Sequence, residues 1–508
     1  MRKTITLITV ALLLSAWSAT AGIPPTEAQR IISEIRSREP LRSASVGVLA
    51  VRMDGDTVAA LDFQRKLLPA SNIKILTTGM ALHTLGADYR FGTTLAHSGE
   101  VRGGVLHGDL YIVGGGDPTT GSRSESAIPL SRTHETWMKM LTDAGIRRIE
   151  GRVLGDARFF GEATSQHLGW THDDLGTNYG AGPLGLNFFE NAQLLYVTPG
   201  AAAGSAPKVT PRYPDTPWMQ YSNLATTGAA RSANTLYYVC TPLGPFGQVA
   251  GSFPLDRRGY MLECHNAFGA YTCASYFCNY LQSRGIEVTG GFGDVTPQGR
   301  IRTTLEFGKA STPAEVQQDL TVLGRAYSAT LAEIAADTNK ESDNFYAETL
   351  LRMVAARGGF PTDQDNCEKA AEATLRAMGL RTDNACRQID GSGLSRKNYV
   401  APAFFVRFLQ KMTTLPAWDA FFASLPVPGD KGTLETRMRD GAQELKDRFH
   451  MKSGSMNGVF CFSGYILPAD GDASHMIVFS LMVNNVTASA FAVYPILEEI
   501  MLALAAEN

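Results

Sequence analysis

The chain has 508 residues, of which 44% are hydrophobic and 19% are charged, and its formal net charge is −3. These values are ordinary for a globular protein with a sizeable hydrophobic core, and the length predicts about two to four domains. The slightly negative charge, together with the lack of a long basic run, argues against a protein that binds nucleic acid.

The first 21 residues have the three parts of a secretory signal peptide. Arg2 and Lys3 form a charged start, residues 5–16 are apolar, and Ala19-Thr20-Ala21 matches a cleavage site, so we expect the mature chain to begin at Gly22. An uncleaved membrane anchor is the alternative, but the apolar stretch is short for a span. No later stretch has the ~20 apolar residues of a spanning helix. We therefore expect export to the periplasm or cell envelope and no transmembrane segment after signal removal.

The elements that follow alternate between helical and extended patterns. A helix is expected over residues 26–38, and the two apolar runs within 45–63 flank an Asp54-Gly55 turn, which indicates a β-hairpin. Apolar residues at helical spacing after Ser71 place this serine at the start of a helix. Residues 88–310 are rich in glycine, proline, aromatic residues and short apolar runs, which favours a β-rich inserted region.

The C-terminal part returns to the pattern of the N-terminal part. We expect a helix over residues 345–356, one strand within 449–468, a second within 474–485, and a closing helix over 490–506. The fold class predicted from this order is α+β. In this plan, the segments 22–87 and 311–508 together build one sheet and its helices, and the inserted region lies between them.

The chain has seven cysteines, and disulfides are common in exported proteins. Pairing of Cys367 with Cys386, and of two pairs within the group at 240–278, is compatible with their spacing, but spacing does not determine connectivity. The 240–278 group fits no standard zinc pattern, so we expect no metal and no cofactor. Cys461 lies in an apolar run and is expected to be a free core residue. The seven are Cys240, Cys264, Cys273, Cys278, Cys367, Cys386 and Cys461.

Three short strings stand out because of their order. They are Ser71-Asn72-Ile73-Lys74, Ser342-Asp343-Asn344 and Lys452-Ser453-Gly454. Each alone has an ordinary explanation: a surface serine with a solvated lysine, a helix N-cap, and the end of a strand. Together they supply a nucleophile, a base, a proton relay and a carboxylate-binding strand, which favours a catalytic site.

The first string brings a nucleophile and a base into reach. Lys74 follows Ser71 by three residues, so on a helix both side chains lie on one face. A serine hydroxyl needs a neighbouring base to become a good nucleophile. Lys74 acts as a base only when neutral, and burial together with the positive charge of Lys452 would lower its pKa from the reference value of ~10.4.

The other two strings supply the remaining functions. Ser342 could pass a proton to the leaving amine, while Asn344 orients Lys74 and the substrate amide. Lys452 and the Ser453 hydroxyl could bind a terminal carboxylate, with Gly454 beside them in the same strand. We expect the oxyanion hole to consist of the backbone N–H groups of Ser71 and Ser455, one such donor being worth about 10²–10³ in rate.

The set S-x-x-K, S-x-N and K-[ST]-G is that of penicillin-recognising serine enzymes. Longer strings resemble the class C low-molecular-mass penicillin-binding proteins, which are D-alanyl-D-alanine carboxypeptidases and endopeptidases of peptidase family S13. The resemblance implies a transpeptidase-like domain formed by 22–87 and 311–508 and split at 88–310 by two nested smaller domains. The strings are PASNIKILTTGMAL, ESDNFYAETLL, DGSGLSRKN (390–398), LPVPGDKGTLETR (425–437) and MKSGSMNGV.

The resemblance also implies an activity and further site residues. Ser71 would form an acyl-enzyme with peptidoglycan stem peptides and with β-lactams. Asp156, Phe160 (next to Phe159) and Arg396 would bind the diaminopimelate side chain of the substrate, and Ser453 stands where threonine is usual. Two alternatives remain open: a β-lactamase or esterase on the same fold, for which no deacylating glutamate is assignable, and a non-catalytic peptidoglycan-binding protein. The oligomeric state is not indicated.

Overall fold

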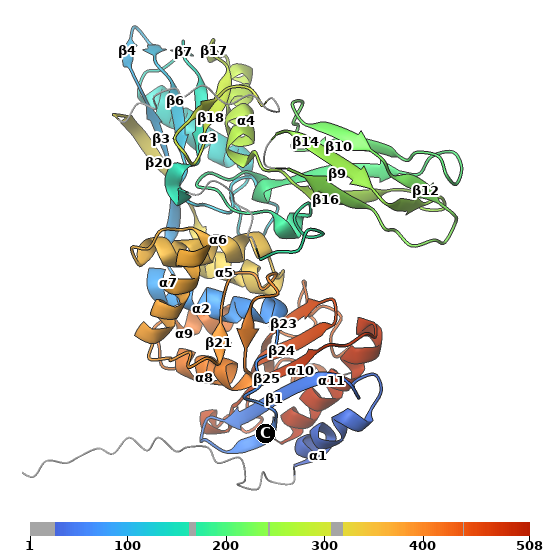
Figure 1. The fold of residues 1–508 in the computed structure, drawn as a ribbon. Helices are drawn as coiled ribbons and strands as arrows, with labels where there is room; N and C mark the ends of the chain where they lie inside the picture. Colours follow the sequence, from blue (N-terminus) through green and yellow to red (C-terminus); the bar gives the residue numbers. More distant parts are fainter. Residues whose placement is uncertain (1–25, 162–168, 242–243, 306–318, 440, 508) are drawn as a thin grey trace, which may run out of the picture.

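The computed structural model describes residues 26–161, 169–241, 244–305, 319–439 and 441–507. The predicted signal peptide therefore lies outside the described residues. Figure 1 shows a lower part in which helices cover a sheet, an upper part with a second sheet, and a group of strands that projects sideways from it. The predicted α+β class is confirmed, because helices and mainly antiparallel sheets alternate along the chain.

Both ends of the chain build one antiparallel sheet in the order β2-β1-β25-β24-β23. The Asp54-Gly55 hairpin joins the first two strands, as predicted. Residues 449–468 were predicted as one strand but form two, because the chain turns at Asn457-Gly458, where Gly458 has a φ of 76°. The strands are β1 (Ser45–Arg52), β2 (Thr57–Leu61), β23 (Phe449–Met456), β24 (Val459–Ile466) and β25 (Ile477–Asn484).

Helices cover both faces of this sheet, and each face has its own hydrophobic core. One face packs against α1 and α11, and the other against the remaining larger helices. The helices predicted over 26–38, 345–356 and 490–506 are confirmed as α1 with a 3₁₀ turn (Ile35–Ser37), α6 and α11. The helices are α1 (Glu27–Glu34), α2 (Ile73–Leu85), α5 (Leu331–Lys340), α6 (Asn344–Arg357), α7 (Gln364–Ala377), α8 (Pro402–Met412), α9 (Trp418–Ser424), α10 (Gln443–Lys446) and α11 (Ala490–Ala506). A short ladder joins β21 (Cys386–Arg387) to β22 (Tyr399–Val400).

The upper part contains a six-stranded and a four-stranded sheet packed with two helices. Their orders are β19-β18-β8-β6-β3-β20 and β17-β7-β5-β4, and Trp137 and Phe277 lie in the shared core. The helices are α3 (Leu130–Asp143) and α4 (Gly269–Ser283). The strands are β3 (Arg90–His97), β4 (Glu100–Arg102), β5 (Val105–His107), β6 (Leu110–Val113), β7 (Arg148–Ile149), β8 (Val153–Asp156), β17 (Glu287–Val288), β18 (Phe292–Val295), β19 (Ile301–Arg302) and β20 (Thr321–Thr330).

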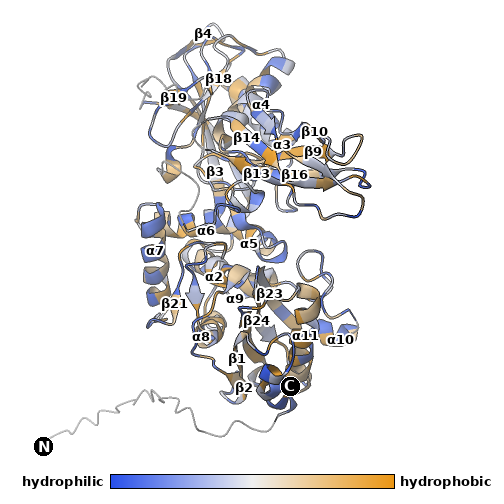
Figure 2. Ribbon diagram, turned by 45° about the vertical axis from the view of Figure 1, so that its right-hand side comes forward, coloured by the Kyte–Doolittle hydropathy of each residue, from blue (hydrophilic) through white to orange (hydrophobic). Residues whose placement is uncertain are grey.

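The projecting group of strands forms small sheets around a core that includes Leu195, Tyr238 and Val249. Figure 2 shows hydrophobic residues concentrated on its facing strands. The strands are β9 (Ala192–Thr198), β10 (Lys208–Tyr213), β11 (Gln220–Asn223), β12 (Thr226–Gly228), β13 (Tyr237–Cys240), β14 (Phe246–Ala250), β15 (Ser252–Pro254) and β16 (Tyr260–His265).

The predicted boundary between residues 310 and 311 lies outside the described residues. The next strand, β20, still pairs with β3 in the upper sheet, and the chain enters the lower part at Leu331, where α5 begins. None of the seven cysteines, all of which lie in the described residues, forms a disulfide, so the pairings considered above are not formed, and Cys461 is buried in β24. Among the described helices, none is both long and apolar enough to cross a membrane.

Candidate active site

Ser71 and Lys74 meet where the chain enters α2. Ser71 lies in a short 3₁₀ turn (Ala70–Asn72) that leads directly into the helix. The serine is half-buried and Lys74 is fully buried. The Lys74 ammonium nitrogen Nζ donates to Ser71 Oγ at 2.9 Å. The three-residue spacing therefore does what the sequence predicts, since it puts a nitrogen base against a hydroxyl that solvent can reach.

Two further oxygens hold the Lys74 nitrogen. Nζ donates to Asn344 Oδ1 at 2.7 Å and to the Ser392 carbonyl oxygen at 2.7 Å. Asn344 is the first residue of α6, and Asp343 caps this helix by accepting the Tyr346 N–H at 2.8 Å. With Ser71, these contacts complete the donor capacity of an ammonium group and fix its position.

Ser342 stands at the corner before α6. Its φ is 59°, a left-handed conformation that is uncommon for a residue other than glycine. The corner is held by the Asp343 N–H, which donates to the Thr338 carbonyl at 3.1 Å. Among the described contacts, Ser342 makes no direct hydrogen bond to Ser71 or Lys74, so the structure joins Asn344 to the pair directly and brings Ser342 only to the same corner.

Burial dominates the electrostatics of Lys74. Removal from water lowers its pKa to about 8, although the negative charges of Asp343, Asp390 and Glu348 act in the opposite direction. A substantial fraction of Lys74 is therefore neutral near pH 8. Burial also raises the pKa of Asp343 to about 8, with the charge of Glu190 adding to this effect.

The third string lies on β23, beside the nucleophile. Lys452 is fully buried, its Nζ donates to the Ser453 carbonyl at 2.8 Å, and burial, followed by the charge of Lys74, holds its pKa well below the usual value. Gly454 permits close packing, because a Cβ there would lie 2.7 Å from both Asn72 N and the Pro69 carbonyl oxygen. Ser453 is half-buried and Ser455 is exposed, so this strand presents an accessible edge next to Ser71.

The loop that offers the Ser392 carbonyl is organised around the buried Asp390 carboxylate. Asp390 Oδ1 accepts the Gly393 N–H at 2.9 Å, and Oδ2 accepts the Ser395 N–H at 2.6 Å. Gly393 has a φ of 89°, and a Cβ there would lie 1.9 Å from the Ala70 carbonyl oxygen, so only glycine fits against the nucleophile turn. Glu348 accepts the Ser392 N–H at 2.8 Å, and burial followed by the charge of Asp390 raises the pKa of Glu348 to about 7.

The inserted region contacts this centre at two points. The Trp170 indole N–H donates to Asp390 Oδ2 at 2.9 Å. The Asn344 amide nitrogen donates to the Tyr179 carbonyl at 3.2 Å, which leaves Oδ1 of the same amide facing Lys74. A segment outside the lower part thus orients groups that position Lys74.

Sequence reasoning did not identify these supporting residues. The string at 390–398 contributed only to the resemblance, although an aspartate followed by glycines on both sides of a serine is typical of a tight, polar loop. No signal in the sequence pairs Trp170 with Asp390 or Tyr179 with Asn344, because each contact joins segments that are distant in the chain.

The three residues expected to bind a substrate side chain lie in different surroundings. Asp156 is buried at the end of β8, and its carboxylate is held by Arg158, with Nε at 2.9 Å and Nη2 at 2.6 Å. A substrate ammonium group would therefore compete with Arg158. Phe160 is buried, and its exposed neighbour Phe159 has 47% of its surface accessible. Arg396 is exposed, and its charge contributes to a lowered pKa of Asp173, after hydrogen bonds from Thr171 and the Asp173 backbone.

Comparison with known proteins decides the family. The sequence profile of the D-Ala-D-Ala carboxypeptidase 3 (S13) family matches residues 28–501. The chain belongs to this family. The resemblance stated from the sequence is thereby confirmed, and membership identifies the protein as a D-Ala-D-Ala peptidase.

Individual S13 relatives match over most of their lengths. The D-alanyl-D-alanine carboxypeptidase of Actinomadura sp. (strain R39) is 31% identical over 500 residues, which cover 94% of this chain and 86% of the relative. The D-alanyl-D-alanine carboxypeptidase DacB of Haemophilus influenzae is 24% identical over an alignment that covers 90% of this chain and 89% of the relative. The crystal structure of penicillin binding protein 4 (dacB) from H. influenzae has a TM-score of 0.77 at 22% identity, with 95% of this chain and 99% of that chain covered. A second structure of that protein, in complex with a β-lactam, has a TM-score of 0.71.

Proposed function

We propose that this S13 family member is a serine DD-peptidase of the cell envelope that works through an acyl-enzyme on Ser71. The observation that carries the proposal is the contact of a buried lysine, with a pKa of about 8, against the hydroxyl of a half-exposed serine. A serine–lysine pair of this kind supplies both a nucleophile and a general base. The exported location rests on the predicted signal peptide.

The acylation step follows from this geometry. Neutral Lys74 accepts the hydroxyl proton while Ser71 Oγ bonds to the carbonyl carbon of the penultimate D-alanine. The backbone N–H groups of Ser71 and Ser455 stabilise the oxyanion. The C–N bond then breaks, and the proton passes from Lys74 through Ser342 to the nitrogen of the departing D-alanine. Water attacks the resulting ester, releases the shortened peptide and restores Ser71.

Substrate binding uses the edge of β23. Lys452 and the Ser453 hydroxyl bind the terminal carboxylate of the peptide, whose negative charge would favour the protonated form of Lys452. Asp156, Phe160 and Arg396 form the expected side-chain site, in which Arg158 already neutralises Asp156. Because a β-lactam presents a strained amide beside a carboxylate, it reacts with Ser71 in the same way but leaves no departing amine. The H. influenzae protein crystallised with a β-lactam supports this assignment.

The assay that tests the proposal compares two substrates. Purified mature protein is incubated with benzylpenicillin and, separately, with a pentapeptide ending in D-Ala–D-Ala. We expect a stable mass adduct equal to one penicillin, together with release of D-alanine. Rapid penicillin turnover without a stable adduct would identify a β-lactamase, and neither adduct nor turnover would identify a binding protein. Release of peptides from a cross-linked dimer would add endopeptidase activity to carboxypeptidase activity.

A second prediction concerns the contact between the inserted region and the Lys74 loop. Trp170→Phe keeps the aromatic ring but removes the N–H that binds Asp390. A buried hydrogen bond to a charged group contributes about 1.5–3 kcal/mol, so the loop at 391–395 should lose order. We expect the acylation rate constant to fall by about ten-fold, with kcat for the peptide reduced much more than KM changes.

The chain offers a matched control for this change. The indole N–H of Trp218 is buried without a hydrogen-bond partner, so Trp218→Phe makes the same change of ring without breaking a hydrogen bond. The control should acylate at the wild-type rate. Equal rates for the two variants would show that Trp170 does not position the site.

A further inference from the structure

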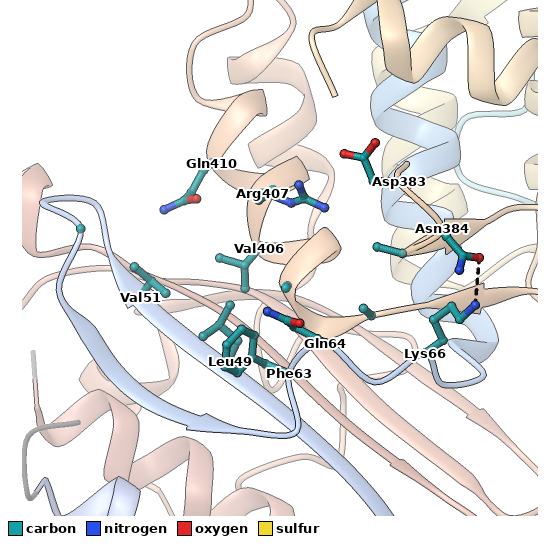
Figure 3. Close-up of a pocket in the computed structure, with 14 residues that line it drawn as sticks. Leu49, Val51, Phe63, Gln64, Lys66, Asp383, Asn384, Val406, Arg407 and Gln410 are labelled. Carbon is teal, nitrogen blue, oxygen red and sulfur yellow. Dashed lines mark hydrogen bonds between the residues drawn. The ribbon is translucent and has the colours of Figure 1, made fainter. Parts of the chain in front are cut away.

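A cavity of about 880 Å³ lies beside the edge of the five-stranded sheet, between β1 and α8. Figure 3 shows Leu49 and Val51 of β1 on one side, Val406 of α8 on the other, and polar side chains around the opening. Its volume is within the range of small-molecule sites, about 300–1,000 Å³. Neither Ser71 nor Lys74 lines it, and the inference below does not rest on the proposed peptidase function.

The apolar floor exists because α8 stops short of the sheet edge. This helix packs over β25 and β1, whereas the edge strand β2 lies beyond it. Leu49 and Val51 point to the α8 side, while Val48 and Ala50 point to the core under α1 and α11. Leu49 and Val51 are themselves buried, so the apolar surface of the cavity comes from the half-buried Phe63, Ala385 and Ala403, and the segments at 63–66 and 383–385 form its walls.

The opening carries positive charge that no carboxylate balances. Lys66 Nζ donates to the amide oxygen of Asn384 at 3.0 Å, which neutralises no charge. Arg407 is exposed at the opening and makes no ion pair with a described residue; its guanidinium lies 5.5 Å from the centroid of the Phe404 ring. The carboxylate at this edge, Asp383, is already bound by Arg381 at 3.0 Å. Figure 3 shows Arg407 on α8 and Lys66 beside Asn384.

We propose that this cavity binds a small amphiphilic acid. Its apolar body would pack on Phe63, Ala385 and Ala403, and its anionic group would lie near Arg407 and Lys66. Apolar burial favours any ligand of suitable size. The two cations favour an anion over a neutral molecule of the same shape, because their positive charges attract a carboxylate and have no comparable attraction for a neutral head.

Decanoate is a suitable probe, and decanol is its neutral counterpart with the same chain length. Both are titrated calorimetrically into the mature protein, below the concentration at which decanoate forms micelles. We expect decanoate to bind at least about ten-fold more tightly than decanol. Arg407→Gln should weaken decanoate binding about five-fold and leave decanol unchanged. The matched control is Arg300→Gln, which removes an exposed charge on the turn before β19 and should change neither.

A second variant tests the floor. Ala403 lines the cavity from α8, and its backbone N–H donates to the Phe63 carbonyl at 2.9 Å, a bond that a side-chain change preserves. Ala403→Phe should fill the cavity and abolish binding of both probes. Should this variant fail to fold, Arg407→Gln decides the question alone, since it changes an exposed side chain.

A third experiment, with phosphatidylglycerol vesicles, distinguishes a membrane lipid from a soluble amphiphile as the ligand. Sedimentation with vesicles that depends on Arg407 would identify a lipid within a bilayer, and binding of decanoate without vesicle capture would identify a soluble amphiphile. The proposal is overturned when decanoate fails to bind at millimolar concentration, or binds wild type, Arg407→Gln and Ala403→Phe equally. Penicillin labelling of the same samples is independent of all these outcomes.

Discussion

Replacement of Ser71 by alanine is expected to abolish both the penicillin adduct and D-alanine release. Without Oγ no covalent intermediate forms, and loss of a nucleophile from a serine hydrolase typically costs about 10⁴- to 10⁶-fold in rate. Residual activity should therefore be below about one ten-thousandth of wild type. The measurement is intact-protein mass spectrometry for the adduct and a coupled assay for free D-alanine.

The fold should survive this change, which makes the result interpretable. Ser71 is half-buried, and the described structure gives its hydroxyl one hydrogen bond, from Lys74. Lys74 keeps its contacts to Asn344 and Ser392 in the variant. We therefore expect the melting temperature to stay within about 2 °C of wild type. Ser283→Ala removes an exposed hydroxyl at the end of α4, in the upper part of the molecule, and should leave activity intact. Substantial D-alanine release by Ser71→Ala would exclude the proposed nucleophile.

Some residues around this nucleophile can be placed in the site from the sequence alone, and others cannot. Ser71 and Lys74 could be paired from sequence because one helical turn separates them, and Asn344 because a capped helix start presents its side chain. The Ser392 carbonyl could not, since its contact with Lys74 spans 318 positions and depends on how two loops pack. A backbone acceptor also has no characteristic residue type, so no pattern in the sequence marks it.

In the fold too, features set by neighbouring residues were easier to predict than contacts between distant segments. Hairpins and helices with clear turns and caps were predicted correctly, such as the Asp54-Gly55 turn and α11. The β23–β24 hairpin was missed: residues 449–468 were predicted as one strand, although Asn457-Gly458 within them is a strong turn signal between two extended runs. The contact of Asn344 with Tyr179 follows from how the inserted region meets the lower part, which periodicity does not encode.

The second large effect concerns the base. Because Lys74 must be neutral to accept the serine proton and burial lowers its pKa to about 8, the acylation rate constant should rise with pH. Below this pH the ammonium form predominates and the rate should fall about ten-fold for each pH unit. Lys74→Met, which matches the length of the stem but has no nitrogen, should reduce acylation at least about 10³-fold at every pH.

A change that leaves Lys74 in place separates its pKa from its position. Glu348→Gln preserves an oxygen that can accept the Ser392 N–H but removes a negative charge that raises the pKa of Lys74. The midpoint of the pH profile should therefore move to lower pH. Between pH 7 and 8, where Glu348 ionises in wild type, the variant should acylate faster than wild type at the same pH. Loop disorder would instead slow the reaction at all pH values without moving the midpoint. A profile that is flat between pH 6 and 10 in wild type would show that another group takes the proton from Ser71.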